Sequence, residues 1–451
     1  MRQPISWSAL ADASVGVWGL GVEGQASIRR LRSMGRAPVL VDDQPTATGL
    51  DGLDGLDGLD GLEILQTDAG GLDALRRCDV VIKSPGISRY RPDMTQLQKA
   101  GVVVCGGLGL FMAEADPARV ACITGTKGKS TTTAMAVHLL RGLGVDARAG
   151  GNIGLPPWDP AGGPAPEYWI IETSSFQVPD LQNGPSVVAV TSLSPDHLDW
   201  HGTVERYYAD KLSLCTKPGV TLALADGADE ELHANAGLLG PHVRWVGAAD
   251  VERDAPWSAA LGLSGPHNAR NASVARAVLE GLGIPGASDE ERLVAAAQGF
   301  DGLPSRCRSL GTVGTVEFVD DSLSTNVLPA QAALQAFAGR PVALLVGGHD
   351  RGLDYAPLGR SIAARTAPTL VLTMPDNGPR IGQAVRDATT GLVEVRDAVD
   401  LDAAVDAAFA WAPAGGVVLL SPAAPSFGRF ANYRERSAAF AAAASRCGML
   451  S

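Results

Sequence analysis

The run TGTKGKST at residues 124–131 contains the residue types that bind the phosphates of a nucleoside triphosphate. Its glycines let backbone N–H groups approach a phosphate closely, and a helix that starts there adds a partial positive charge. Lys129 can reach the β- and γ-phosphates, and the Ser130 hydroxyl can ligate Mg²⁺. Ile123 stands where the usual pattern has its first glycine, so the loop is a shortened variant. An ordinary glycine-rich turn is the alternative, but the apolar VACI before the run and the helical STTTAMAVHLL after it favour ATP binding.

A second glycine-rich run, GLGVEG at residues 19–24, also follows a strand-like segment and opens a helical one. Asp42 ends the next expected strand about 20 residues later, as in dinucleotide-binding folds. The SPG turn at residues 84–86 ends the strand-like run DVVIK, where it could meet the same diphosphate or be a plain turn. A nicotinamide-dependent oxidoreductase would use this loop but would leave the loop at Lys129 unexplained. Two nucleotide sites therefore favour an enzyme that uses ATP and a nucleotide-linked substrate.

Two further side chains follow expected strands beside the phosphate loop. Glu172 ends the run YWII, and His197 lies in TSLSPDHLD, which follows VVAV. A carboxylate and an imidazole at strand ends are suited to holding Mg²⁺ near a phosphate, although each alone could be a capping or core group. The run SGPHNARN at residues 264–271 is by itself an ordinary helix start.

The elements that must position these residues are short Val/Ile/Leu runs that alternate with longer Ala/Leu-rich stretches. This alternation predicts an α/β protein with mostly parallel sheets. Three composition blocks predict three domains, at residues 1–106, 107–302 and 303–451. We expect Rossmann-like first and third domains and a central domain like that of P-loop ATPases. The Gly-Leu-Asp repeat between residues 49 and 62 is interpreted as a surface loop, against an acidic tether.

Composition limits the classes of protein that need be considered. The chain has 451 residues, 45% hydrophobic and 19% charged, with a formal net charge of −12. No apolar run is long enough to span a membrane and no export signal is present, so a cytoplasmic protein is expected. The six cysteines are scattered without a CxxC pair, which predicts reduced thiols. The negative charge disfavours nucleic acids and anionic membranes as partners.

Taken in order, these segments resemble the Mur ligases, and most closely their glutamate-adding branch. The matching runs are GLGVEG, KSPGI, TGTKGKST, GGNIGLP, ETSSFQ, SPDHLDWH with the following YYADK, SGPHNARNA, LPSR, DDSLSTN and LLSPAAPSF. Folylpolyglutamate synthetases share the ATP core but lack this N-terminal domain. The resemblance implies a monomeric ATP-dependent ligase that joins glutamate to UDP-N-acetylmuramoyl-L-alanine through an acyl phosphate, in peptidoglycan precursor synthesis.

The resemblance also implies a role for individual residues. The nucleotide-linked substrate would contact Gly21, Val22, Glu23, Asp42, Ser84, Gly86 and Asn152. ATP would contact Gly125, Thr126, Lys127, Gly128, Lys129, Ser130, Thr131, Asn268, Asn271, Arg306 and Asp321. Two Mg²⁺ ions would be held by Ser130, Glu172, His197 and Lys211, and the catalytic residues would be Lys129, His197 and Lys211. Because an ammonium repels Mg²⁺, Lys211 would have to be carbamylated; the alternative is an exposed helix lysine.

The expected amino-acid pocket departs from the family pattern. Its residues would be Thr325, Arg351, Ser426 and Tyr433. Leu323 replaces a lysine, Arg351 replaces another, and the run at 426–429 reads Ser-Phe-Gly-Arg, with Pro425 before it. A guanidinium is not interchangeable with an ammonium in binding carboxylates. We therefore favour the variant branch that adds L-glutamate; the alternatives are the usual D-glutamate ligase and, remotely, an inactive or accessory nucleotide-binding relative.

Overall fold

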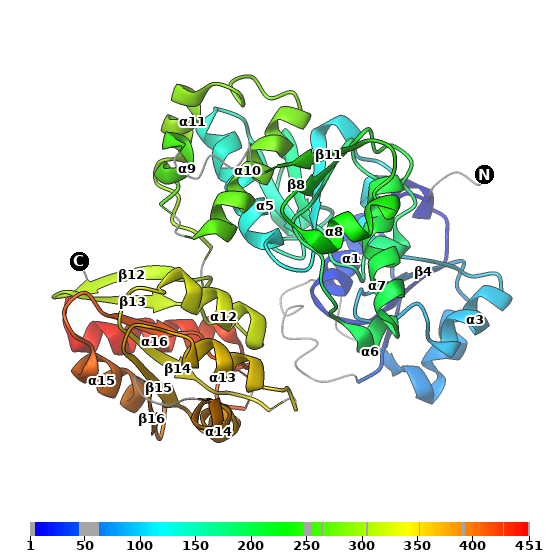
Figure 1. Cartoon of the computed structure of the whole chain (residues 1–451). Helices are drawn as coiled ribbons and strands as arrows, with labels where there is room; N and C mark the ends of the chain where they lie inside the picture. Colours follow the sequence, from blue (N-terminus) through cyan, green and yellow to red (C-terminus); the bar gives the residue numbers. More distant parts are fainter. Residues whose placement is uncertain are drawn as a thin grey trace. The chain divides into compact units, whose positions relative to one another are not determined.

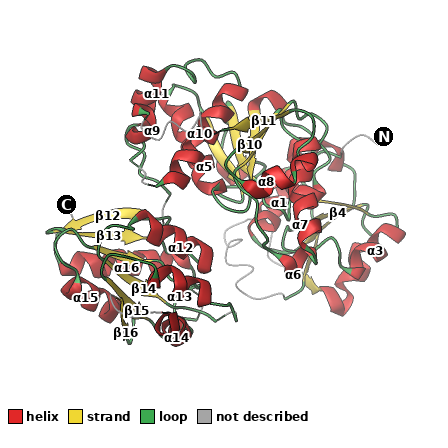
Figure 2. Ribbon diagram, in the orientation of Figure 1, coloured by secondary structure: helices red, strands yellow, loops and turns green. Residues whose placement is uncertain are grey.

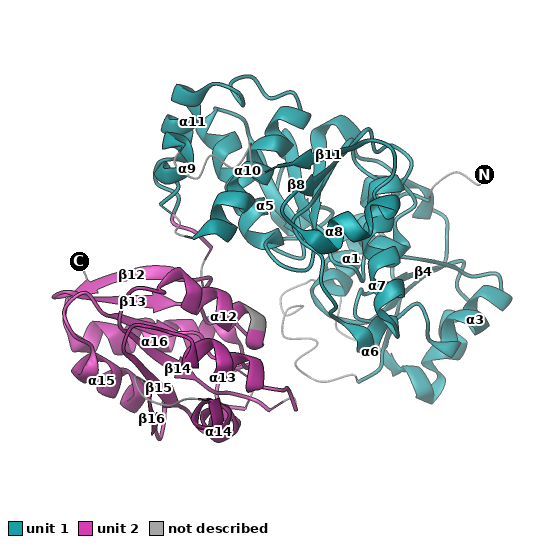
Figure 3. Ribbon diagram, in the orientation of Figure 1, with its two compact units in different colours: residues 1–300 teal, residues 301–451 magenta. Residues whose placement is uncertain are grey.

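The structure is a computed structural model that describes residues 5–44, 63–247, 255–262, 265–303, 305–350, 352–388, 393–426 and 428–449 (Figure 1). The Gly-Leu-Asp repeat and Arg351, both singled out above, lie outside the described residues. The chain divides into two compact units, residues 1–300 and 301–451 (Figure 3). The first unit contains two sheets and the second contains one.

The first sheet has five parallel strands in the order β3-β2-β1-β4-β5. The strands are β1 (Val15–Trp18), β2 (Val39–Asp42), β3 (Ile64–Gln66), β4 (Val80–Lys83) and β5 (Val103–Cys105). Its helices are α1 (Val22–Ser33), α2 (Leu72–Leu75), α3 (Pro92–Lys99) and α4 (Gly107–Met112). The strand order reverses direction between β1 and β4, and ligands bind at such switch points in open α/β sheets.

The second sheet has six parallel strands in the order β11-β10-β9-β6-β8-β7. They are β6 (Val120–Thr124), β7 (Ala147–Gly151), β8 (Tyr168–Glu172), β9 (Val187–Val190), β10 (Leu222–Asp226) and β11 (Val243–Val246). The helices are α5 (Lys129–Gly142), α6 (Leu198–His201), α7 (Val204–Leu212), α8 (Glu230–Ala234), α9 (Pro256–Ala260), α10 (Pro266–Gly281) and α11 (Glu290–Ala297). Strand β6 is buried along its whole length, as expected of a central parallel strand covered on both faces.

The third sheet, in the second unit, has the order β12-β13-β17-β14-β15-β16. Figure 2 shows its strands β12, β13, β14, β15 and β16 in yellow. Its strands are β12 (Arg308–Val313), β13 (Val316–Asp320), β14 (Val342–Val346), β15 (Thr369–Thr373), β16 (Val393–Asp397) and β17 (Val417–Leu420). The helices are α12 (Val327–Ala336), α13 (Ala356–Ala363), α14 (Gly378–Ala388), α15 (Leu401–Trp411) and α16 (Tyr433–Cys447). Strand β12 pairs antiparallel with β13, so this sheet is mixed. The α/β prediction with mostly parallel sheets is confirmed.

Two expectations from composition also meet structural observations. All six cysteines are free thiols. Within the described residues, no helix combines the length and the hydropathy needed to cross a bilayer.

Candidate active site

The phosphate loop connects β6 to α5 and requires glycine at two positions. Gly128 precedes the helix in a left-handed conformation with φ +87°, and a Cβ there would lie 2.5 Å from Asn271 Oδ1. Gly125 has φ +137°, and its Cβ would lie 2.3 Å from Thr191 Oγ1. A side chain at either position would therefore be strained and would collide with its neighbour. The loop leaves the first N–H groups of α5 without a side-chain cap, which is the arrangement that binds anions.

The end of β9 holds this loop in shape. The Thr126 N–H donates to Ser192 O at 2.8 Å, and the Lys127 N–H donates to Ser192 Oγ at 2.8 Å. The Thr191 hydroxyl donates to Lys127 O at 2.5 Å. Because both sides of the loop bond to the neighbouring strand end, its shape is set before any ligand binds.

Three lysines surround the loop. Lys129 Nζ donates to Gly125 O at 2.9 Å and to Thr126 O at 3.0 Å. Lys211 Nζ, from α7, donates to Gly125 O at 2.9 Å. Lys127 Nζ lies 3.3 Å from Asp196 Oδ2. Lys127 and Lys129 therefore place positive charge at the described loop, which suits a polyphosphate.

Lys211 is buried with only 2% of its surface exposed. Burial, and then the nearby Lys129, hold the pKa of the Lys211 amine well below its usual range. Thr203 positions the lysine by capping α7: its side chain accepts from the Arg206 N–H at 3.2 Å. The surroundings at the loop thus favour the neutral amine. The neutral amine is the nucleophilic form, because its nitrogen lone pair is free.

Glu172, at the end of β8, is 1% exposed. Its Oε1 accepts from Asn152 Nδ2 at 2.8 Å, whereas Oε2 is buried without a hydrogen-bond partner. A buried, unpartnered carboxylate oxygen is costly unless a further group binds it, and a divalent cation satisfies that need. Asn152, predicted to touch the nucleotide-linked substrate, therefore contacts a predicted metal ligand.

His197 precedes α6 in a left-handed conformation with φ 52°. Burial lowers its pKa, with Lys211 and Lys129 acting in the same direction and Asp196 opposing them. Its ring packs edge-on against Phe176, with centroids 4.8 Å apart. A neutral imidazole can ligate a metal, so this environment fits the predicted role.

No cluster of three or more His, Cys, Asp or Glu side chains that could hold a metal occurs among the described residues. Glu172 and His197 would therefore need further ligands. The predicted set supplies them from the Ser130 hydroxyl and the modified Lys211, and phosphate oxygens and water would complete it.

The glycine loop between β1 and α1 is fixed from two sides. The Leu20 N–H donates to Asp42 Oδ2 at 2.7 Å, and the Ser84 hydroxyl donates to Gly19 O at 2.6 Å. Asp42 Oδ1 also accepts, from the Gln44 N–H at 2.9 Å. Asp42 and Ser84 thus shape the loop, whereas Gly21, Val22 and Gly86 are exposed there.

Glu23, also in this loop, turns its carboxyl inward. Gln177 Nε2 donates to Glu23 Oε1 at 2.5 Å, and burial raises the pKa of Glu23 to about 7. Nearby, Lys83 Nζ pairs with Asp180 Oδ2 at 2.5 Å. The Glu23 side chain therefore joins the first sheet's loop to the segment after β8, an interaction that the sequence did not reveal.

In the second unit, the predicted ATP residues Arg306 and Asp321 lie close together. Asp321 accepts from the Ser421 hydroxyl at 2.7 Å and from the Cys307 N–H at 3.1 Å. Burial raises the pKa of Asp321 to about 7, and the Arg306 charge opposes the rise. Arg306 Nε is buried without a hydrogen-bond partner.

A buried arginine joins two loops that carry predicted amino-acid-binding residues. Arg436 Nη2 donates to Ser322 O at 2.8 Å and to Ala424 O at 3.0 Å. This links the loop of Thr325 to the loop of Ser426, which is itself buried. Tyr433 begins α16, where its hydroxyl accepts from Arg434 Nε at 3.3 Å. Arg436 was not among the predicted residues.

Three family models match: Mur ligase MurD-like, N-terminal domain, at residues 13–106; Mur ligase middle domain, at 123–236; and Mur ligase, glutamate ligase domain, at 305–424. A protein of Micromonospora sp. named UDP-N-acetylmuramoyl-L-alanine--L-glutamate ligase is 40% identical over 97% of this chain and 97% of that protein. The chain belongs to the Mur ligase family. It is accordingly an ATP-dependent ligase.

Further Mur ligase relatives agree with this. A protein of the same name from Xanthomonas euvesicatoria is 40% identical over 96% of this chain and 95% of that protein. The structure of UDP-N-acetylmuramate-alanine ligase MurC from Thermotoga maritima aligns with TM-score 0.58 at 18% identity, over 96% of this chain and 99% of that one. MurF ligase from Thermotoga maritima, solved in complex with ADP, aligns with TM-score 0.54 at 14% identity, over 96% of this chain and 95% of that one. These structures share the Mur ligase fold.

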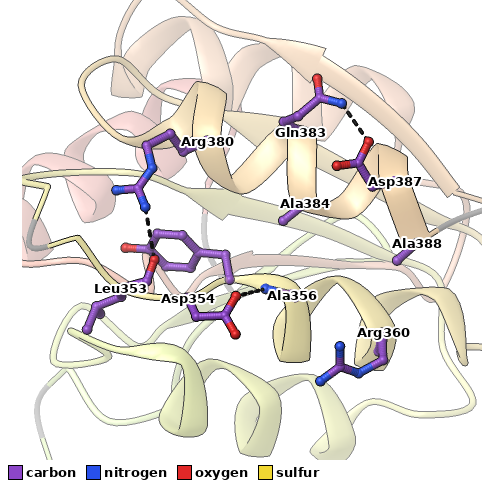
Figure 4. A pocket seen from close by; sticks show the side chains of 10 residues that line it. Leu353, Asp354, Ala356, Arg360, Arg380, Gln383, Ala384, Asp387 and Ala388 are labelled. Atoms are coloured by element: carbon purple, nitrogen blue, oxygen red, sulfur yellow. Dashed lines mark hydrogen bonds between the residues drawn. The ribbon is translucent and has the colours of Figure 1, made fainter.

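One cavity in this Mur ligase is lined by none of the predicted site residues that the structure describes. It has a volume of about 570 Å³ and lies beside α13 and α14 in the second unit (Figure 4). Its charged side chains are largely satisfied by neighbours: Arg380 Nη1 pairs with Asp350 and Nη2 donates to Leu353 O at 3.1 Å, while Gln383 Nε2 donates to Asp387 Oδ1 at 2.7 Å. Of the predicted amino-acid-binding residues that the structure describes, Thr325, Ser426 and Tyr433, none lines it.

Proposed function

We propose that this Mur ligase joins L-glutamate to UDP-N-acetylmuramoyl-L-alanine, with ATP as the energy source, in the cytoplasmic synthesis of peptidoglycan precursors. The observation that carries the proposal is the grouping of Lys129 and Lys211 on one loop carbonyl, Gly125 O, beside the strand end that presents Glu172. This arrangement suits transfer of a phosphoryl group to a carboxylate rather than hydride transfer, because no step of a hydride transfer needs a second polyphosphate site.

The reaction we propose has two steps. The terminal carboxylate of the alanine attacks the γ-phosphorus of ATP; the bond to the bridging oxygen breaks, giving an acyl phosphate and ADP. The glutamate amine then adds to the acyl carbon and loses a proton, and phosphate leaves as the amide forms. Lys129 and the α5 N–H groups would offset negative charge on the transferring group. His197 could steady the charge of the tetrahedral intermediate.

We propose that Lys211 is carbamylated. The lone pair of the neutral Nζ attacks the carbon of CO₂, and the proton that Nζ then loses passes to solvent, which leaves an anionic carbamate. The lowered pKa of Lys211 favours this reaction, because a protonated amine has no lone pair to donate. The carbamate would convert a cation that repels Mg²⁺ into an oxygen ligand.

The residues fit Mg²⁺, since Glu172 has an unpartnered buried oxygen and the lowered pKa of His197 favours the neutral imidazole that binds a metal. We propose that Ser130 and Glu172 hold one ion, and that His197 and carbamylated Lys211 hold the other. When bound, Mg²⁺ supplies Lewis-acid polarisation of phosphate oxygens.

The choice of L-glutamate rests on two supports. The relatives from Micromonospora and Xanthomonas carry L-glutamate in their names. Apart from Arg351, the departures from the usual family pattern lie on the two loops that Arg436 joins: Leu323 lies between Ser322 and Thr325, and Gly428 and Arg429 follow Ser426.

The test supplies purified full-length protein with UDP-N-acetylmuramoyl-L-alanine, ATP and Mg²⁺, adds L- or D-glutamate separately, and measures phosphate release. We expect release only with L-glutamate. Release only with D-glutamate would overturn the stereochemical part of the proposal. Release with neither isomer would overturn the ligase reaction itself.

A further inference from the structure

Two hydrogen-bonded chains run from the first sheet's loops to one short segment after β8. That segment, Thr173–Ser174–Ser175, directly follows Glu172, and each chain ends on a different one of its serines. Both chains lie within the first compact unit. None of the chain members Tyr90, Asp210, His201, Ser174, Ser175 and Gln177 has a role in the proposed reaction.

The first chain begins at Tyr90, which follows the Ser84–Gly86 turn. The Tyr90 hydroxyl donates to Asp210, at 2.7 Å from Oδ1 and 2.8 Å from Oδ2. Burial, together with Asp210, raises the pKa of Tyr90 to about 12, so the hydroxyl keeps its proton at neutral pH. The ring also packs edge-on to Trp200, with centroids 5.6 Å apart. Asp210 immediately precedes Lys211 on α7, so this bond holds the helix turn that carries the lysine.

The same chain continues through a buried histidine. His201 Nδ1 lies 2.7 Å from Asp210 Oδ2, and His201 Nε2 lies 3.0 Å from Ser175 Oγ. Because a carboxylate only accepts, Nδ1 must carry the hydrogen of the first bond. His201 and Ser175 are 1% and 2% exposed, so neither can exchange this partner for water without local opening.

The second chain begins at Glu23 in the other glycine-rich loop. Gln177 bridges it to the same segment: its Nε2 donates to Glu23 Oε1, and its Oε1 accepts from the Ser174 N–H at 2.8 Å and the Ser174 hydroxyl at 3.0 Å. Thr173 then links the segment to the ATP loop, because its N–H donates to Ile123 O at 2.9 Å and its carbonyl accepts from the Thr124 hydroxyl at 2.9 Å.

We propose that Tyr90 and Ser175 are positioning residues that couple binding of the nucleotide-linked substrate in the first sheet's loops to the setting of Glu172 and Lys211 at the ATP site. This rests on the proposed function. A ligand that orders the Ser84–Gly86 turn would restrain Tyr90, and through its hydrogen bond Asp210 and the adjacent Lys211. Through His201 it would also restrain Ser175, three residues after Glu172. Such coupling is reciprocal, so each ligand tightens the other's binding.

The experiment measures Mg·ADP binding to the full chain by calorimetry, with and without saturating UDP-N-acetylmuramoyl-L-alanine. For the unaltered protein we expect the Kd of Mg·ADP to fall by about fivefold or more when the acceptor is present, within the usual range for coupled sites. Tyr90→Phe keeps the ring and removes the hydroxyl donor. In this variant we expect the acceptor to lower the Kd of Mg·ADP by less than about twofold, while the Kd of the acceptor measured without Mg·ADP changes less than twofold. Ser175→Ala should lose the coupling in the same way, and the double variant should lose no more than either single one.

The matched control is Tyr168→Phe, which removes a hydroxyl from β8, the strand that carries Glu172, but outside both chains. It should keep the coupling of the unaltered protein. Coupling that persists in both Tyr90→Phe and Ser175→Ala, or that is lost equally in Tyr168→Phe, would overturn the inference, as would its absence in an unaltered protein that binds both ligands. Failure of the unaltered protein to bind the acceptor would instead count against the proposed function.

Discussion

The two glycine-rich loops of the first unit share a backbone conformation but differ in the charged side chains bonded to them, which are acidic at the first loop and basic at the second. Each follows a parallel strand and precedes a helix, and each has a left-handed glycine, Gly19 at φ +90° and Gly128 at φ +87°. Acidic Asp42 binds a backbone N–H of the first loop, whereas Lys129 and Lys211 bind a carbonyl oxygen of the second. Shape therefore prepares both loops to approach a phosphate closely, and the lysines distinguish the loop that can stabilise a transferring phosphoryl group.

The sharpest test of this contrast is to remove the charge from the second loop. Lys129→Ala should lower the rate of phosphate release by about 10³-fold, because it removes a preorganised positive group at the developing charge. The matched change at the first loop, Asp42→Asn, should weaken acceptor binding and leave Mg·ADP binding within about twofold. Steady-state phosphate release measures the rate for Lys129→Ala, and calorimetry measures the two binding constants for Asp42→Asn. A Lys129→Ala protein with near-normal turnover would mean that the loops have been assigned the wrong way round.

Lys211→Met should separate activity from stability. We expect phosphate release to fall by about 10²-fold, because the proposed metal ligand is lost. The folded pKa of Lys211 lies below its usual 10.5, so the native state binds fewer protons than the unfolded state below that pH, and stability from this group rises with pH. In protein kept free of CO₂, where Lys211 is the free amine, replacing it should therefore leave the Tm at pH 7 unchanged or higher. A drop in Tm of several degrees would show that the amine stabilises the fold.

Alanine at the crowded glycines should affect one loop at a time. A Cβ at Gly24 would lie 1.9 Å from Gly19 O, and one at Gly128 would lie 2.5 Å from Asn271 Oδ1. We expect each substitution to cost about 1–3 kcal/mol in urea unfolding, from overpacking. Gly24→Ala should weaken the binding of UDP but not of Mg·ADP. Gly128→Ala should weaken the binding of Mg·ADP but not of UDP. Gly237→Ala, outside both loops and with no atom within 4 Å of its Cβ, is the control and should change neither.

The smallest expected effect is on pH dependence. The pKa of Glu23 is raised from 4.5 to about 7 in the folded state, so between these values the native state holds a proton that the unfolded state has lost. Stability from this group is therefore present below about pH 4.5 and falls as the pH rises to about 7. Glu23→Gln should flatten the decline in Tm over that range by a few degrees. Equal slopes in the two proteins would contradict the burial of this carboxyl.

The sequence predicts the strand, glycine-rich turn and helix around residues 124–131, and the strand ends beside them, because their signals are local. Apolar runs locate β6, β8 and β9, and parallel strands place their carboxyl ends along one edge of a sheet. Interactions between distant residues give no such signal: Tyr90 and Asp210 are 120 positions apart, and nothing near either residue indicates the other. Glu23 was expected to face the substrate, yet its carboxyl turns to Gln177, 154 positions away.

The second unit illustrates a different limit. Strand β13 is evident from the run VEFVDD, but β12 was not predicted, since LGTV lacks a strong alternating pattern and is defined by its antiparallel pairing with β13. Arg436 likewise lies in an ordinary helical sequence, and only the fold brings it within hydrogen-bonding distance of the loops that carry Ser322 and Ala424.

Each compact unit is one uninterrupted stretch of chain, residues 1–300 and then 301–451. In the part of the chain that the structure describes, neither sheet of the first unit contains a strand from the second unit. A ribosome therefore delivers every residue of the first unit before it starts the second. Because domains generally fold as units during synthesis, we expect the nucleotide loops to acquire their shape while the remaining third of the polypeptide is still being translated.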